Sequence, residues 1–203
     1  MKKWMSLFDL CPIRPSEQKE RAARITAMSY LRDCQDKEQR MEKQLLNTGE
    51  YILLRGKDSY NGLLQRIETN PVSRITGRAI VDLYNSVPKS HRKNAVFLMN
   101  TVTLNELSRS PGVDRNLLSS RDDGTFMLMD QPIVLCNAMP FISKGSVPIL
   151  FGNFGKVSIE DCGRDELQQE PCEGNPGTQQ YTLTGYMDCM LEEQLAVRGI
   201  KIV

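Results

Sequence analysis

The sequence predicts an α+β fold, in which buried strands and amphipathic helices follow one another in irregular order. Short apolar runs at 95–99, 133–136 and 147–151 predict buried strands. A charge-rich segment without Gly or Pro at 16–46 predicts one long helix. With 203 residues, the chain can form one large domain or two small ones and bury a substantial core.

The composition is typical of a soluble globular protein, with 40% hydrophobic and 25% charged residues. The 26 Lys and Arg residues nearly balance the 25 Asp and Glu residues, which argues against a dedicated nucleic-acid binder. Lys2 and Lys3 precede an apolar stretch, but Asp9 and Pro12 interrupt it, so a signal peptide is not predicted. We therefore expect synthesis in the cytoplasm and no association with a membrane.

The first third of the chain is predicted to be helical and then turn-rich. Ala22, Ile25 and Met28 form a narrow apolar stripe at helical spacing within 16–46, with Ser16 as a cap. Residues 47–65 contain glycines on both sides of an apolar run, which predicts a turn, a short strand and a second turn.

A helix, a strand and another helix are predicted next. Thr76 is a candidate cap for an amphipathic helix that includes Ile80 and Leu83 and ends at Pro88. The run at 95–99 then predicts a buried strand. The helix after it begins, on this interpretation, with a capping box in which Thr103 is the cap.

The second half of the chain is predicted to be mostly strands. The run at 133–136 ends at Met139 and Pro140, and the run at 147–151 is broken at Gly152 and Gly155 before a possible fourth strand. Residues 163–180 are rich in polar residues, Pro and Gly and predict a loop. Alternating apolar residues from Tyr181 onward predict a final strand with one buried face.

Two glycine-lysine motifs raise the possibility of nucleotide binding. A phosphate-binding Walker loop requires two glycines separated by four residues, followed by Lys and then Ser or Thr. In "FGNFGKVS" at 151–158, Gly152 and Gly155 are too close together, and Val157 occupies the hydroxyl position. The motif "RGKDS" at 55–59 fails for the same reasons, so neither motif predicts a phosphate site.

The residues that could support nucleophilic or metal chemistry are scattered. The single histidine, His91, lies among basic residues in "KSHRK" and is predicted to be in a surface loop. No two cysteines have the close spacing of zinc ligands, so we expect reduced thiols that act as small hydrophobic residues. The six cysteines are Cys11, Cys34, Cys136, Cys162, Cys172 and Cys189.

Paired acids do not predict a catalytic dyad either. Glu192 and Glu193 are adjacent in a strand-like segment and would point to opposite faces, so ion pairing is the better interpretation. The residues therefore predict no catalytic, cofactor-binding or metal-binding site, and no enzyme activity.

Taken in order, several motifs resemble the major capsid proteins of tailed bacteriophages, whether from a phage or a prophage. The motifs are "FLMN" at 97–100, "QPIV" at 131–134, "AMP" at 138–140 and "FGNF" at 151–154. Residues 59–65 and 75–96 are similar to the segments that precede this strand in the family, and 191–203 resembles its closing strand. The resemblance extends in order over 50–203.

The resemblance implies a shell subunit of the phage capsid and encapsulin fold with two parts. An axial domain, with a central sheet flanked by helices, is expected at 62–165. A peripheral domain is expected to combine 1–61, which contains the long spine helix at 16–46, with the returning segment 166–203. Self-assembly into pentamers and hexamers of an icosahedral shell around double-stranded DNA is also implied, with non-specific DNA contact and with phage scaffold, protease and portal proteins as possible partners.

The chain departs from the family pattern before the predicted spine helix. Family members usually carry an N-terminal arm and a long β-hairpin, the extension loop, at that place, and the fifteen residues before Ser16 are too few for both. Some relatives form an isopeptide crosslink that uses Lys, Asn and Glu. Gly185 occupies the expected Asn position here and the lysine-bearing loop is missing, so no crosslink is predicted.

Two alternative functions remain open at this point. The same fold builds encapsulin compartments, which are shells without a genome. A different class is a small α/β enzyme that binds a nucleotide at "FGNFGKVS" or pairs a cysteine with His91.

The contacts between subunits are expected in two loops, because loops near a symmetry axis pack against their own copies. These loops are 110–123 and 163–180. The candidate contact residues are Arg115, Arg121, Asp122, Arg164 and Asp165.

Overall fold

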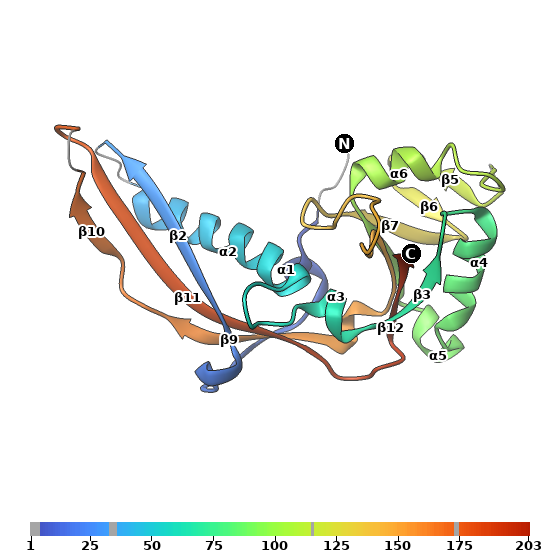
Figure 1. Cartoon of the computed structure of the whole chain (residues 1–203), viewed down its shortest axis with the longest axis horizontal. Helices are drawn as coiled ribbons and strands as arrows, with labels where there is room; N and C mark the ends of the chain where they lie inside the picture. Colours follow the sequence, from blue (N-terminus) through green and yellow to red (C-terminus); the bar gives the residue numbers. More distant parts are fainter. Residues whose placement is uncertain (1–4, 33–35, 115, 173–174) are drawn as a thin grey trace.

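The structure is a computed structural model that describes residues 5–32, 36–114, 116–172 and 175–203. The molecule is elongated, with a long twisted sheet at one end and a rounder sheet flanked by helices at the other (Figure 1). No helix in these ranges is long and apolar enough to span a bilayer. The fold is α+β, as the sequence predicts.

The elongated part is a five-stranded sheet covered by one long helix, α2 (Lys37–Arg55). The longest strand, β11 (Gln179–Leu191), pairs with β2 along one side and with β10 and then β9 along the other. The remaining strands are β1 (Ile13–Pro15), β2 (Ala23–Leu31), β9 (Val157–Arg164) and β10 (Gln168–Pro171).

Glycines allow α2 to lie close to this sheet. Gly49, in the middle of the helix, is near Ile25 of β2, and a Cβ atom at this position would lie 3.1 Å from the Ile25 side chain. Gly185 of β11 packs under Leu45 in the same way. The apolar residues Met41 and Leu45 of α2 are fully buried against the strands.

The second part is a seven-stranded sheet in the order β3-β12-β8-β4-β7-β6-β5. Its central strands are apolar on both faces, which explains their unbroken apolar sequences. Phe97, Ile133 and Phe151 face one core, whereas Leu98 and Val134 face the core shared with the elongated part. The strands are β3 (Glu68–Val72), β4 (Val96–Met99), β5 (Leu118–Ser120), β6 (Phe126–Leu128), β7 (Gln131–Leu135), β8 (Ile149–Gly152) and β12 (Val197–Ile202).

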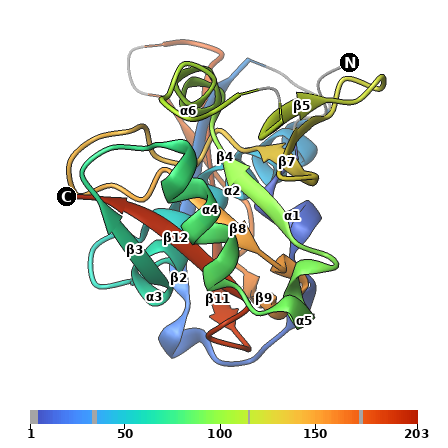
Figure 2. The ribbon, with the colours of Figure 1, turned by 90° about the vertical axis from the view of Figure 1, so that its right-hand side faces the viewer.

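Helices cover the face of this sheet that is turned away from the elongated part (Figure 2). α4 (Gly77–Ser86) begins at its predicted cap, Thr76, whose side chain accepts a hydrogen bond from the Ala79 amide. The remaining helical segments are short. They are α1 (Leu7–Leu10), η1 (Lys19–Arg21), α3 (Leu63–Arg66), α5 (Lys89–Arg92), α6 (Thr101–Leu107) and η2 (Phe154–Lys156).

The long helix predicted at 16–46 is wrong in its position. Residues 23–31 form strand β2, and the helix runs from Lys37 to Arg55, through the turn and strand predicted at 47–65. The segment 23–31 also has period-two alternation, with Ala23, Ile25 and Ala27 buried, and pairing with β11 favours the strand over the helix. The long helix is therefore preceded by residues 1–36 and not by fifteen residues.

Three smaller predictions also need correction. Asn100, not Thr103, is the cap of α6, because its side chain accepts a hydrogen bond from the Thr103 amide at 2.7 Å. The segment 163–180 contains the end of β9, all of β10 and the start of β11, so it is not one loop. Glu192 and Glu193 lie in a bend after β11 rather than in a strand.

The strands predicted at 95–99, 133–136 and 147–151, the strand after Gly155 and the final strand are all present. The chain passes between the two sheets at 56–67, 153–156 and 192–196. By pairing, β9 belongs to the five-stranded sheet and β12 to the seven-stranded sheet.

Candidate functional site

The motif at 151–158 is a tightly packed turn between the two sheets. A Cβ atom on Gly152 would lie 2.1 Å from the Ala196 carbonyl oxygen, so only glycine fits there. Phe154 is buried, and the Asn153 side chain accepts a hydrogen bond from the Gly155 amide at 3.1 Å. The Lys156 ammonium lies 2.6 Å from Glu193. The glycines thus allow close chain packing, and the lysine is paired within the chain.

The motif at 55–59 is the turn that follows α2. Gly56 has a φ of 77° and caps the helix, and Lys57 and Tyr60 then form an isolated β-bridge. A Cβ atom on Gly62 would lie 2.4 Å from the Gly56 amide nitrogen. In this turn the backbone around Gly56 therefore packs directly against the backbone around Gly62.

The ion-pair partner of His91 is a carboxylate and not a cysteine thiol. His91 lies in α5, a short helix rather than the predicted loop, and its Nε2 is 3.3 Å from a carboxylate oxygen of Glu193. Burial raises the pKa of the Cys136 and Cys189 thiols to about 12, so both stay protonated and are poor nucleophiles. Cys34 lies outside the described residues. Within the described ranges no group of His, Cys, Asp and Glu could bind a metal.

The paired acids form ion pairs, as the sequence predicts, and the partners seen in the structure lie within the chain. Glu192 lies 2.7 Å from Arg14, which follows α1. Glu193 contacts both Lys156 and His91. Each acid therefore connects the bend after β11 to a different segment.

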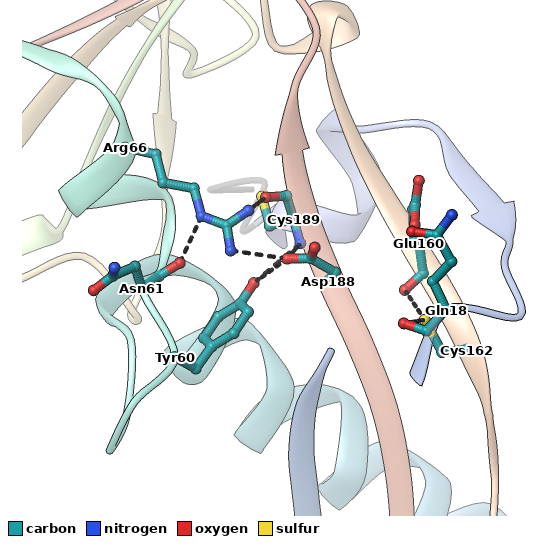
Figure 3. Close-up of polar contacts among 8 residues, drawn as sticks. All are labelled: Gln18, Tyr60, Asn61, Arg66, Glu160, Cys162, Asp188 and Cys189. Carbon is teal, nitrogen blue, oxygen red and sulfur yellow. Dashed lines mark hydrogen bonds and ion pairs between the residues drawn. The ribbon is translucent and has the colours of Figure 1, made fainter. Parts of the chain in front are cut away.

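A polar cluster around the buried Asp188 joins the segment after α2 to β11 (Figure 3). The Asp188 carboxylate accepts a hydrogen bond from the Tyr60 hydroxyl at 2.9 Å and lies 3.0 Å from the Arg66 guanidinium. Arg66 also donates to the Asn61 carbonyl at 2.7 Å and to the Cys189 carbonyl. The cluster is positioned where the elongated sheet approaches the second part of the molecule.

The contacts of this cluster stabilise a buried charge. Asp188 is only 6% exposed, and a buried carboxylate requires a partner of opposite charge. Burial and the adjacent Asp188 carboxylate raise the pKa of Tyr60, so its hydroxyl remains a donor. The Tyr60 hydroxyl in turn accepts a hydrogen bond from the Cys189 amide. The contacts of Tyr60 and Arg66 with Asp188 and Cys189 hold the segment that contains α3 on β11.

Sequence reasoning missed this cluster. One signal was available, because Asp188 is a charged residue between two buried apolar residues, Met187 and Cys189, in a predicted strand. A partly buried contact, from the Cys162 thiol to the Gln18 carbonyl at 3.6 Å, joins the N-terminal segment to β9 (Figure 3).

Asn100 connects two of the motifs on which the family resemblance depends. It is 3% exposed and ends the "FLMN" strand. Its side-chain amide donates to the carbonyl of Met139 at 3.1 Å and to that of Pro140 at 2.8 Å, both in the "AMP" motif. The strand-to-helix turn therefore holds a loop that is distant in the sequence.

A comparison of the sequence with protein-family models identifies the family. Residues 39–192 match the model of the Phage capsid family.

The chain belongs to the phage capsid family.

Solved shell structures share the fold of this phage capsid family member. The capsid of the empty GTA particle is 15% identical and matches with a TM-score of 0.69, covering 100% of this chain and 91% of that one. An encapsulin complex from Synechococcus elongatus PCC 7942 is 15% identical, with a TM-score of 0.61 over 90% of this chain and 74% of that one.

A phage structure gives a similar result. Gordonia phage Cozz is 9% identical, with a TM-score of 0.57 over 89% of this chain and 70% of that chain. No curated protein matches the sequence. Identities this low establish a common fold, and the family match establishes the membership.

The predicted contact residues of this capsid-family chain lie at two separate places. Arg121 and Asp122 are exposed in the turn between β5 and β6, and Arg115 lies outside the described residues. Arg164 and Asp165 lie at the end of β9, in the elongated part. Arg164 is 2.7 Å from Glu42 of α2, and Asp165 accepts a hydrogen bond from the Tyr186 hydroxyl at 3.4 Å. The role of all five in subunit contacts stays a prediction.

Proposed function

We propose that this chain is a structural subunit that assembles with copies of itself into pentamers and hexamers of an icosahedral shell. The observation that carries the proposal is the family match over 39–192, supported by a fold that superposes over its full length on a capsid subunit. The family and the fold are those of structural proteins. On this proposal the shell encloses double-stranded DNA and the protein resides in the virion.

The proposed subunit has an axial domain, expected at 62–165, and a peripheral domain, expected to combine 1–61 and 166–203. Because β9 pairs within the five-stranded sheet and β12 within the seven-stranded sheet, we assign 157–164 to the peripheral domain and 197–202 to the axial domain. Synthesis in the bacterial host cytoplasm, non-specific contact with packaged DNA, and scaffold, protease and portal partners complete the proposal. The similarity to an encapsulin supports a second candidate function, a protein compartment without a genome.

The proposal is tested by purifying the chain and imaging it by negative-stain electron microscopy. Fivefold and sixfold rings or closed shells are the expected result. Nuclease-treated particles should retain DNA if the shell encloses a genome and should lack it if the shell is a compartment. A protein that stays monomeric at every concentration and is thermally stabilised by ATP would contradict the structural function.

The predicted contact residues are tested by charge reversal. Arg121→Glu should weaken ring formation, whereas Arg78→Glu, an exposed change in α4, should not. Arg164→Glu also breaks the contact with Glu42, so the Glu42→Lys change is added to restore that pair. If the double variant assembles normally, Arg164 acts within the chain and not between subunits.

A further inference from the structure

The edge of β2 differs from every other sheet edge in the described part of the chain. β2 has nine residues and no proline, and its register with β11 is continuous from Ala23 to Leu31. The edge strands β1, β10 and β3 contain Pro15, Pro171 and Pro71, and β5 has only three residues. Proline and short length protect sheet edges from pairing with other chains. β2 lacks both kinds of protection.

The groups on this edge are available for pairing. In an antiparallel ladder the backbone groups of alternate residues point away from the partner strand. No strand of the described residues other than β11 pairs with β2, so these groups on the side opposite β11 have no strand partner there. Ala23, Ile25 and Ala27 are buried under α2. The other face is exposed, with Met28 51% and Tyr30 58% exposed.

We propose that β2 pairs antiparallel with β2 of a second copy, about a twofold axis at Ala27. This inference rests on the proposed function, since it names one contact through which the subunits associate. The pairing joins two five-stranded sheets into one continuous sheet with both α2 helices on the same face. A twofold contact of this kind is self-complementary, because every pair of different residues in it occurs twice, once on each side of the axis.

The exposed side chains match in this register. Arg24 lies opposite the partner's Tyr30, which allows a cation–π contact, and Thr26 lies opposite the partner's Met28. Each of these pairs occurs twice around the axis. All nine residues of the strand are paired. Ala23 lies opposite the partner's Leu31 at one end, and Leu31 lies opposite the partner's Ala23 at the other.

Other registers are less favourable. A shift of the axis by one residue toward Met28 places Arg24 opposite the partner's Arg32, and like charges opposite each other destabilise a sheet. A parallel pairing in register places Arg24 beside the partner's Arg24. Charge and complete pairing therefore both favour the axis at Ala27.

Charge exchange tests the register. One chain carries Thr26→Lys and Met28→Lys, and a second carries Thr26→Glu and Met28→Glu. Both positions are exposed, so each chain should keep its fold and melting temperature. Alone, each chain places like charges opposite each other and should associate roughly tenfold more weakly than the native chain. Mixed, the two chains should regain association, as measured by native mass spectrometry.

A matched pair of variants on the opposite edge is the control. Gln168→Lys with Glu170→Lys, mixed with Gln168→Glu, changes charge on β10 and should show no recovery that depends on mixing. In a second measurement, a Thr26→Cys chain is mixed with a Met28→Cys chain and oxidised with diamide. A disulfide between these two positions in different chains is the expected product, mapped by mass spectrometry.

The results separate this inference from the proposed function. Shells that form without the disulfide, and without recovery of the mixed charge variants, overturn the β2 contact and leave the shell function standing. A native chain that never associates overturns the shell function, and the β2 contact fails with it. Recovery on mixing together with the disulfide supports both.

Discussion

The guanidinium of Arg66 lies 3.0 Å from the carboxylate of Asp188, and this ion pair joins α3 to β11 at the junction of the two parts of the molecule. The Asp188 side chain is 9% exposed and the Arg66 side chain 29%. The carboxylate is therefore more dependent on its partner than the guanidinium is. Because Tyr60 precedes α3 and Arg66 ends it, one short segment satisfies the buried acid.

Replacing Arg66 by Met should destabilise the protein by about 3–5 kcal/mol, because it leaves a buried carboxylate without its counter-charge. Urea unfolding followed by circular dichroism measures the loss. Arg78→Met is the matched control, since Arg78 pairs with Asp82 at 3.9 Å on the exposed face of α4 and should cost less than about 1 kcal/mol.

A double variant distinguishes the ion pair from simple packing. Asp188→Asn added to Arg66→Met removes the unpaired charge and should recover part of the lost stability. If the double variant is as unstable as the sum of the two single variants, the pair carries no coupling and the interpretation is wrong.

Replacing Asn100 by Ala should cost about 2–4 kcal/mol. The change removes the cap of α6 and leaves the carbonyls of Met139 and Pro140 without their side-chain donor. Asn105→Ala, in the same helix but exposed, should change the free energy of unfolding by less than about 0.5 kcal/mol. Equal effects of the two changes would show that the clamp is not important for stability.

Gly152→Ala should lower stability strongly, because the new methyl group would meet the backbone of residues 196–197. Overpacking of this kind typically costs about 1–3 kcal/mol and sometimes more. In Gly155→Ala the methyl group would meet only the Asn153 side chain, at 3.1 Å, and should cost less. Thermal melts of both variants compare them directly, and a more damaging Gly155→Ala would contradict the packing argument.

The central strands could be predicted because both of their faces are buried. The runs around Phe97, Val134 and Leu150 are apolar without interruption. Their short length favours a strand that is buried on both faces over a helix. The segment at 23–31 was ambiguous, because Ala22, Ile25 and Met28 fit a helix while Ala23, Ile25 and Ala27 fit a strand. Pairing with β11, whose residues lie 148 (Leu31 to Gln179) to 164 (Ala23 to Met187) positions away in the sequence, decides between them.

The polar contacts at the junction could not be predicted in the same way. Tyr60 and Asp188 are 128 residues apart, and no periodicity connects them. The same is true of Asn100 and Pro140, although both lie in motifs that the family resemblance identified. A single sequence shows which residues are unusual for their strand, but not which residue satisfies them.

The ion pair between Glu193 and Lys156 should make stability depend on pH. The hydrogen bond from Lys156 lowers the pKa of Glu193, and the same hydrogen bond raises the pKa of Lys156. Glu193 therefore contributes stability above the ordinary pKa of a glutamate, near 4.3, and loses it as the pH falls through the lowered value. Lys156 contributes stability below the ordinary pKa of a lysine and loses this contribution as the pH rises through the raised value.

The melting temperature of Glu193→Gln should thus fall below that of the native protein at neutral pH, and the difference should vanish at strongly acidic pH. Glu17→Gln, an exposed change near the N-terminus, is the control, and a difference that persists in acid would show that the effect does not come from this ion pair.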